Sequence, residues 1–283
     1  MDYYSRIQKA VDFIEANLEN AFTLTDVSKR AFSSLSYLHR VFYFMTGYTV
    51  KEYIRKRRLS QAAVSLHCSK KSIIDIALTT FYDSPESFSR AFKKHYGISP
   101  RDFRQQNQEI ELFNKLDVIN TFARQPTPER DFDLTLKYVI YKSVEISGFQ
   151  TRTTLEGGQQ AIDICNFADK VMGSNQLVEL FHLEATPVFG VYTNMTDENE
   201  FDYTIGCLTH QLKQANKKLV HHILPTSRYV RFTLTRADRI KEAWHYIYGS
   251  WFPKNEAVRT KGFDFETYEK DSVEIYIPMN ETD

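Results

Sequence analysis

The stretch Ser84-Pro85-Glu86-Ser87-Phe88-Ser89-Arg90-Ala91-Phe92-Lys93-Lys94-His95-Tyr96-Gly97 carries the signals of a complete short helix. Ser84 can cap the free N–H groups, Pro85 stands where its missing N–H is harmless, and Gly97 ends the helix. The apolar residues recur at intervals of three and four, which predicts one buried stripe made of Phe88, Ala91, Phe92 and Tyr96. The opposite face carries Glu86, Ser89, Arg90 and Lys93, with Lys94 on its flank. Such a face suits the major groove of DNA, although an ordinary amphipathic surface helix has the same pattern.

A second copy of this pattern lies earlier in the chain, in Ser34–Tyr43. Its outward residues are Ser36, His39, Arg40 and Tyr43. Each copy is preceded by a short helix whose start has the pattern of a capping box, in Thr23–Asp26 and Ser72–Asp75. A short helix, a tight turn and a second helix form the helix-turn-helix pattern, here in tandem. A helix over residues 51–67 is predicted to connect the two copies.

These motifs together resemble the DNA-binding domain of the AraC/XylS family of transcription regulators. The resemblance runs from about Thr25 to Phe103 and is carried by the stretches Arg57–Ala62, Ser72–Ala77, Ser84–Lys93 and Gly97–Pro100. It implies that the outward residues of both copies contact double-stranded DNA in two adjacent major grooves, with RNA polymerase as a further partner.

The two tight turns depart from the family pattern, which usually has glycine there. Phe32 and Phe81 occupy these positions. Because phenylalanine resists a positive φ, both turns are expected to be wider or slightly strained.

Charge is divided unevenly along a chain whose net charge is zero. Residues 1–107 hold 17 lysines and arginines against 10 acidic residues, and the remainder holds 19 against 26. A basic first part beside an acidic second part indicates that only the first meets phosphate. The three scattered cysteines, the absence of an apolar run of membrane-spanning length and a start unlike a signal peptide favour the cytoplasm.

The segment Gln125–Asp131 contains two prolines and is the best candidate for a domain boundary. We therefore expect a DNA-binding domain over 1–107, a linker over 108–132 that includes an amphipathic helix at 109–123, and a second domain over 133–283. The second domain shows the order strand, helix, strand, strand twice. The predicted fold class is α+β: an all-α tandem helix-turn-helix domain followed by a pseudo-symmetric, duplicated β-α-β-β domain.

This second domain resembles the GyrI-like effector-binding domain over about residues 135–280. The resemblance is carried by Tyr203–Gly206, Glu242–Trp244, Trp251–Pro253, Phe265–Tyr268 and Glu274–Pro278. Ser250 and Phe263 depart from the family pattern. The resemblance implies a small-molecule effector and places Glu266 in the ligand cleft.

Alternation along a strand puts Asp264, Glu266 and Tyr268 on one face. A carboxylate among aromatic rings can hold a lipophilic cation, and the candidate walls are Tyr192, Tyr229, Trp244, Trp251 and Tyr268. The alternative is that Glu266 faces solvent and the aromatic residues are core.

Other functions have weaker support. The adjacent residues His221 and His222 would face opposite sides of a strand, and the sequence has no nucleophile elbow, phosphate-binding glycine loop or paired-cysteine metal site. No cofactor or metal is expected. The alternatives left open are a hydrolase with Glu266 as general base, a protein-binding module, and an architectural DNA binder with little sequence preference.

Overall fold

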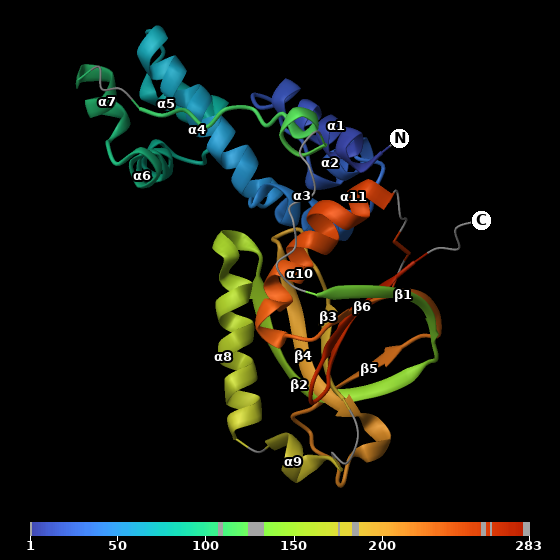
Figure 1. The fold of residues 1–283 in the computed structure, drawn as a ribbon. Coiled ribbons are helices and arrows are strands. Elements are labelled where there is room, and N and C mark those ends of the chain that lie inside the picture. Colours follow the sequence, from blue (N-terminus) through green and yellow to red (C-terminus); the bar gives the residue numbers. More distant parts are fainter. Residues whose placement is uncertain are drawn as a thin grey trace. The chain divides into compact units, whose positions relative to one another are not determined.

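The computed structural model describes residues 2–106, 110–123, 133–174, 176–182, 187–255, 259–260 and 262–279. The chain divides into two compact units. The first unit holds the helices up to η1 except the end of α3, because residues 43–47 are grouped with the second unit. The second unit also holds the strands and the helices from α8 onward (Figure 1). Among the described residues, no helix is both long and apolar enough to cross a membrane.

The first unit is helical, as the sequence predicts, and two helix-turn-helix motifs share the long helix α4 (Figure 1). Phe88 and Phe92 of the second motif are fully buried in a core that also includes Phe103. The helices are α1 (Tyr3–Ala16), α2 (Leu24–Arg30), α3 (Leu35–Thr46), α4 (Val50–Cys68), α5 (Ile73–Thr79), α6 (Pro85–Tyr96), α7 (Pro100–Gln106) and the π-helical turn η1 (Ile119–Ala123).

The predicted helix ends are confirmed. Thr23 and Ser72 each accept a backbone hydrogen bond from an Asp three residues later, and the Asp side chain accepts one in return. Ser84 caps α6, and Gly97 ends it in the left-handed conformation at a φ of 76°. These contacts satisfy donors and acceptors that a helix end leaves open.

Both helix-turn-helix turns place a phenylalanine at positive φ, 51° at Phe32 and 61° at Phe81. Each ring lies under a cation: the Lys9 ammonium is 5.4 Å from the centroid of Phe32, and the Arg58 guanidinium is 4.2 Å from that of Phe81. A cation–π contact of this kind contributes about 0.5–1 kcal/mol at an exposed site, which offsets part of the backbone strain.

Residues 110–123 differ from the predicted amphipathic helix. Residues 110–117 have no regular secondary structure, and the helical turn begins only at Val118 and continues as η1. Phe113 packs against Tyr48 and Tyr53, whereas Ile110 and Leu112 pack on the core of the second motif. The apolar residues serve two separate surfaces, so their helical spacing was misleading.

The second unit contains one eight-stranded antiparallel sheet in the order β1-β6-β8-β7-β3-β4-β2-β5. The two predicted repeats are β2-α8-β3-β4 and β6-α10-β7-β8, and they meet at the central pair β3 and β7. The strands are β1 (Leu134–Tyr141), β2 (Val144–Thr154), β3 (Val188–Thr193), β4 (Glu200–Leu208), β5 (Val220–Leu224), β6 (Ser227–Leu234), β7 (Asp264–Tyr268) and β8 (Val273–Pro278). The helices are α8 (Gln159–Gly173), α9 (Gln176–Leu180), α10 (Ile240–Tyr246) and α11 (Phe252–Asn255), with short turns η2 (Glu156–Gly158), η3 (Thr209–Gln211), η4 (Ala237–Arg239) and η5 (Ile247–Trp251).

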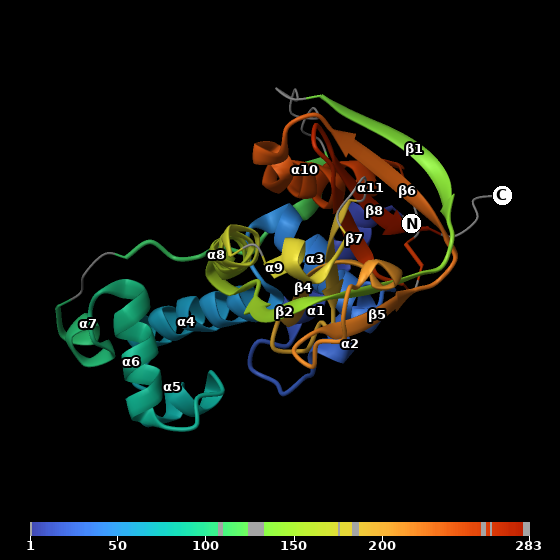
Figure 2. The same ribbon diagram turned by 90° about the horizontal axis from the view of Figure 1, so that it is seen from below.

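A bent two-stranded ribbon curls this sheet. β1 continues into β2 and β5 into β6, so that Tyr141 pairs with Ser227 and Val144 with Leu224 in one unbroken register. Figure 2 shows β1 running around the bend into β2. The curl places the ring centroids of Tyr141 and Phe265 5.1 Å apart, although β1 and β7 are three strands apart in the sheet.

The curled sheet has an inner and an outer face. The inner face holds an apolar cluster of Ile146, Phe189, Val191, Leu224, Tyr229, Phe265 and Tyr276. On the outer face, α8 packs over β2 and β4. Strand alternation therefore decides which face a residue serves, and Glu266 points to the outer face because its neighbour Phe265 points inward.

Two glycines allow β2 and β4 to approach closely. Gly148 and Gly206 are paired across these strands, and a Cβ on Gly148 would lie 2.7 Å from the Cα of Gly206. The clashing atoms are backbone, which cannot rotate away.

We therefore expect Gly148→Ala to lower the free energy of unfolding of the second unit by about 3 kcal/mol, which is within the range of severe overpacking. The measurement is a urea unfolding titration of the full chain, monitored by circular dichroism. Glu145→Ala, an exposed position on the same strand, is the control. Equal midpoints for the two variants would contradict the close approach.

Candidate functional site

The front of α6 has the exposure that DNA contact requires. Glu86, Arg90, Lys93 and Lys94 are exposed and Ser89 is half-buried, while Phe88 and Phe92 face the core. The stripe and the polar face therefore lie where the sequence predicts them. Contact of these five polar residues with DNA stays a prediction.

The corresponding residues of α3 differ in exposure. Ser36 is exposed, whereas His39, Arg40 and Tyr43 are buried. Helical spacing alone did not predict this burial, because it assigns these residues to the side away from the core of the motif. Their role in DNA contact also stays a prediction.

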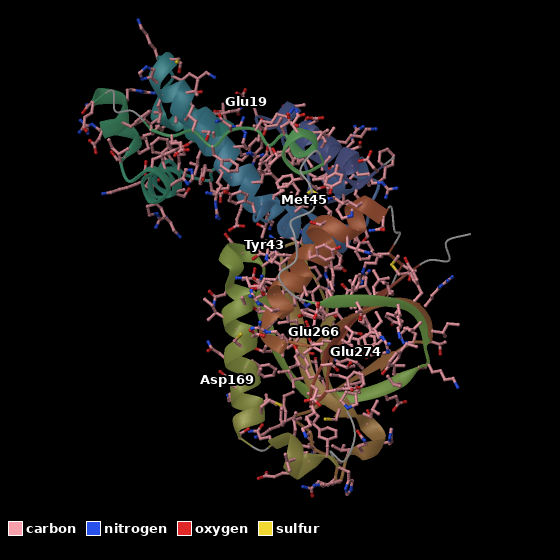
Figure 3. All side chains as sticks on the ribbon, viewed as in Figure 1. Glu19, Tyr43, Met45, Asp169, Glu266 and Glu274 are labelled. Atoms are coloured by element: carbon pink, nitrogen blue, oxygen red, sulfur yellow. The ribbon has the colours of Figure 1, made fainter. Side chains whose placement is uncertain are left out.

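In the second unit, Glu266 lies at the centre of an aromatic cage formed by four side chains, and it is labelled in Figure 3. Its side chain is fully enclosed, with an exposed fraction of 1%. Tyr192 and Trp244 donate to Oε1 at 2.8 and 2.5 Å. Tyr203 and Tyr268 donate to Oε2 at 2.9 and 2.7 Å. Each carboxylate oxygen thus accepts two hydrogen bonds.

The elements of the outer face bring this cage together. Tyr192 comes from β3, Tyr203 from β4, and both Glu266 and Tyr268 from β7, which are adjacent strands of the sheet. Tyr192 is paired with Tyr203 across β3 and β4, so their side chains share a face. Trp244 reaches the site from α10.

Burial raises the pKa of Glu266 above its ordinary value of 4.5, and the hydrogen bonds from Tyr268, Trp244, Tyr192 and Tyr203 lower it in part. Within the described part of the chain, no lysine, arginine or histidine forms an ion pair with this carboxylate. The negative charge is therefore held by neutral donors alone.

Gly190 makes room for the cage. It is paired with Glu266 across β3 and β7. A Cβ at this position would overlap the Tyr203 hydroxyl and lie 2.9 Å from Glu266 Oε2. A larger residue would push two members of the cage apart.

A second buried carboxylate on β7 is handled differently. Asp264 is fully buried and forms an ion pair with Arg259, whose Nη2 and Nε lie 2.6 and 2.9 Å from Oδ1. Tyr248 donates to Oδ2. Two carboxylates on one face of one strand thus differ in their partners, since only Asp264 has a cation.

The structure gathers four of the six predicted ligand residues: Glu266, Trp244, Tyr192 and Tyr268. Tyr229 lies in the inner cluster with Phe265 and Tyr276, and Trp251 packs against Phe232 and Phe252. The sequence reasoning missed Tyr203 as a cage residue. The sequence could have indicated this role, because Tyr203 stands at the start of a strand that follows the strand of Tyr192, and the two residues are paired across these strands.

The two adjacent histidines have separate partners. His221 Nδ1 lies 2.7 Å from Ser147 Oγ, and His222 Nε2 lies 2.9 Å from Thr204 Oγ1. Among the described residues, no group of three or more histidine, cysteine or acidic side chains is arranged to hold a metal ion.

Comparison with known proteins supports both halves of this description. Residues 27–106 match a family model described as a helix-turn-helix domain, and residues 139–279 match one described as an integron-associated effector binding protein.

Individual relatives extend the match along the chain. The transcriptional regulator Rob of Salmonella typhimurium is 36% identical over 271 residues, which cover 95% of this chain and 91% of Rob. The HTH-type regulator YkgA of Escherichia coli is 39% identical over 101 residues, or 36% of this chain and 42% of YkgA. The solved structure of SAV2435 bound to tetraphenylphosphonium is 15% identical, with a TM-score of 0.42, and covers 52% of this chain and 94% of its own.

The match to Rob, at 36% identity, spans both units. One family model covers the helical unit and the other covers the curled sheet. The chain therefore belongs to the AraC family of DNA-binding transcription regulators, in the group that carries a GyrI-like effector-binding domain after the DNA-binding domain.

Proposed function

We propose that the effector of this regulator is a lipophilic cation whose charge is quaternary or delocalised. The observation that carries this proposal is the saturation of Glu266 by four hydrogen bonds. A primary ammonium needs acceptors for its three N–H groups, and the lone pairs of Glu266 are already used. A cation without N–H groups needs only the negative charge and the faces of the electron-rich rings.

The same saturation favours binding over catalysis. A general base must present a lone pair within hydrogen-bond reach of the proton that it removes. Glu266 would have to give up one of its four donors to do so. We therefore propose that Glu266 recognises charge and does not hydrolyse the ligand.

For the first domain we propose that the chain acts in the cytoplasm, reads two adjacent major grooves with α3 and α6, and contacts RNA polymerase. The exposed front of α6 supports the DNA contact. The predicted contacts are Ser36, His39, Arg40 and Tyr43 on α3, and Glu86, Ser89, Arg90, Lys93 and Lys94 on α6.

The DNA proposal predicts different effects for Arg90 and its neighbour Lys93. Arg90→Ala should lower specific affinity by about 1–3 kcal/mol and relax the preference at one base pair, because an arginine can bind guanine with two hydrogen bonds. Arg40→Ala should do the same in the other half-site. Lys93→Ala should weaken binding to all sequences and reduce the salt slope by about 1.

The measurement is fluorescence anisotropy with selected and scrambled duplexes over a range of salt concentrations. If Arg90→Ala weakened binding to both duplexes equally, base recognition by Arg90 would be excluded. An architectural binder would show equal affinity for the two duplexes already in the unmodified protein.

The effector proposal predicts a ranking among three ligands with one naphthylmethyl group. The trimethylammonium compound should bind more tightly than its neutral neopentyl isostere and than its primary ammonium analogue, each by about tenfold, or 1.4 kcal/mol. Glu266→Gln should remove the difference between the cation and the neutral isostere. Gly190→Ala should also lower the affinity for the cation, because the added methyl group disrupts the cage while Glu266 is retained.

Calorimetry on the full chain provides these affinities, and Trp251→Ala is the matched aromatic control outside the cage. A primary ammonium that bound as tightly as the trimethylammonium compound would contradict selection by hydrogen-bond saturation. Equal affinity for the cation and its neutral isostere would contradict charge recognition altogether.

The raised pKa of Glu266 predicts a pH dependence. Only the ionised carboxylate attracts a cation, so affinity should fall as the pH drops through the pKa of the ligand-free site. Because burial raises that pKa, the loss should begin above the ordinary value of 4.5. Titrations of the trimethylammonium compound between neutral and mildly acidic pH test this, and a flat profile in Glu266→Gln is the control. Affinity that stayed constant down to pH 4.5 would be inconsistent with the raised pKa.

A further inference from the structure

The segment 110–118, which we call the strap, crosses the DNA-binding unit from the core of the second motif to α1, which packs on α2 of the first motif. At its start, Ile110 and Leu112 pack on the core of the second motif. At its end, the Val118 N–H donates to Gln8 of α1 at 2.8 Å, and Val118 is fully buried. The Lys115 ammonium lies 2.6 Å from Asp12 of α1.

Between these ends the strap is bound to α4. The Phe113 N–H donates to Ser60 Oγ at 3.0 Å, and Arg57 donates to the Phe113 carbonyl. The Leu116 N–H donates to the Tyr53 hydroxyl at 3.4 Å. Three residues of α4 on successive turns thus hold the main chain of the strap.

The same α4 side chains also contact α1 and the second motif. Arg57 forms a two-pronged ion pair with Glu15 of α1, with both N···O distances 2.8 Å, and Tyr53 donates to Glu15 at 2.7 Å. Ser60 Oγ lies 3.0 Å from the hydroxyl of Tyr96 on α6. Each α4 anchor of the strap is therefore shared with α1 or with α6.

We propose that the strap is a positioning element for DNA recognition, which fixes the separation and orientation of α3 and α6. Two recognition helices reach consecutive major grooves only when they are held about 34 Å apart, one helical turn of DNA. The second motif packs on α4 through Leu59, Ala62 and Leu66, and the strap adds contacts that join this packed core to α1. By joining α1, the first part of α4 and the core of the second motif, the strap restricts rotation of one motif against the other.

This role assigns a function to residues that are neither in the predicted DNA-contact set nor in the effector site. The strap also continues along the chain toward the second domain.

The test measures spacing preference in the full-length protein. A single half-site is first selected from random DNA. Probes then carry two copies of it at centre-to-centre distances of about 10.5 base pairs, and one or two base pairs shorter or longer. The readout is the ratio of affinity at the best spacing to affinity one base pair away.

Phe113→Ala removes the ring contacts of the strap with Tyr53 and Lys56 of α4. Ser60→Ala removes the hydrogen bond from the Phe113 N–H and the contact with the Tyr96 hydroxyl. Val64→Ala, at an exposed position of α4, is the control. We expect the spacing ratio of both strap variants to fall by about threefold or more, with single half-site affinity unchanged within about twofold. Val64→Ala should keep the original ratio.

The ratio separates positioning from stability. A variant that merely unfolded more would lose affinity equally at every spacing, because only the folded fraction would change. Such a uniform loss, or an unchanged ratio in both strap variants, would overturn the proposal. Circular dichroism identifies a variant that fails to fold, and the other variant then decides the question.

Discussion

The burial of Glu266 without a cation is the constraint on which the architecture of the effector domain depends. Removing a carboxylate from water costs several kcal/mol. Four hydrogen bonds to the charged group, each contributing about 1.5–3 kcal/mol, can offset that cost. The domain must therefore deliver four donors to one point, from three neighbouring strands and one helix. Asp264 differs from Glu266, because the nearby Arg259 forms an ion pair with the Asp264 carboxylate. Glu266 instead is held by neutral donors alone.

The order of the strands in the sheet makes this arrangement possible. β3 and β7 come from different repeats, and they are neighbours only because the repeats meet at the centre of the sheet. Glu266 and Tyr268 on β7 can then face Tyr192 on β3 and Tyr203 on β4. Gly190 leaves the space between them open. The bent ribbon holds the outer strands of both repeats in one register, which keeps this central seam in place.

Much of this arrangement could be predicted from the sequence. Helix ends were predictable because caps are local: Thr23, Ser72 and Gly97 form contacts within a few residues. The strands of both repeats were predictable from their β-branched and aromatic content. Alternation along β7 correctly placed Asp264, Glu266 and Tyr268 on one face.

Three features were not predictable because they depend on distant residues. The assignment of Tyr229 to the inner face follows from its pairing with β8 and from the curl of the sheet. The conformation of residues 110–118 depends on acceptors and donors supplied by α1 and α4. The burial of His39 and Arg40 likewise has no signal in the spacing of α3. In each case the tertiary environment, and not the local pattern, decided the outcome.

The basic residues of α4 show why charge counts alone overstate contact with phosphate. Arg57 is bound by Glu15, and Arg58 donates to the carbonyls of Leu18 and Asn20 while its guanidinium lies over Phe81. These two arginines hold the connecting helix and the second turn against the first motif.

Arginine suits this task because its planar group forms several directed hydrogen bonds and stacks on rings at the same time. The positive charge of the first domain therefore has two separate uses. Arg90, Lys93 and Lys94 project from α6 at exposed positions, whereas Arg57 and Arg58 fix the frame that carries α6. A regulator that must place two helices in two grooves needs such internal contacts, because phosphate contacts can orient a helix on DNA only after the frame has brought it there.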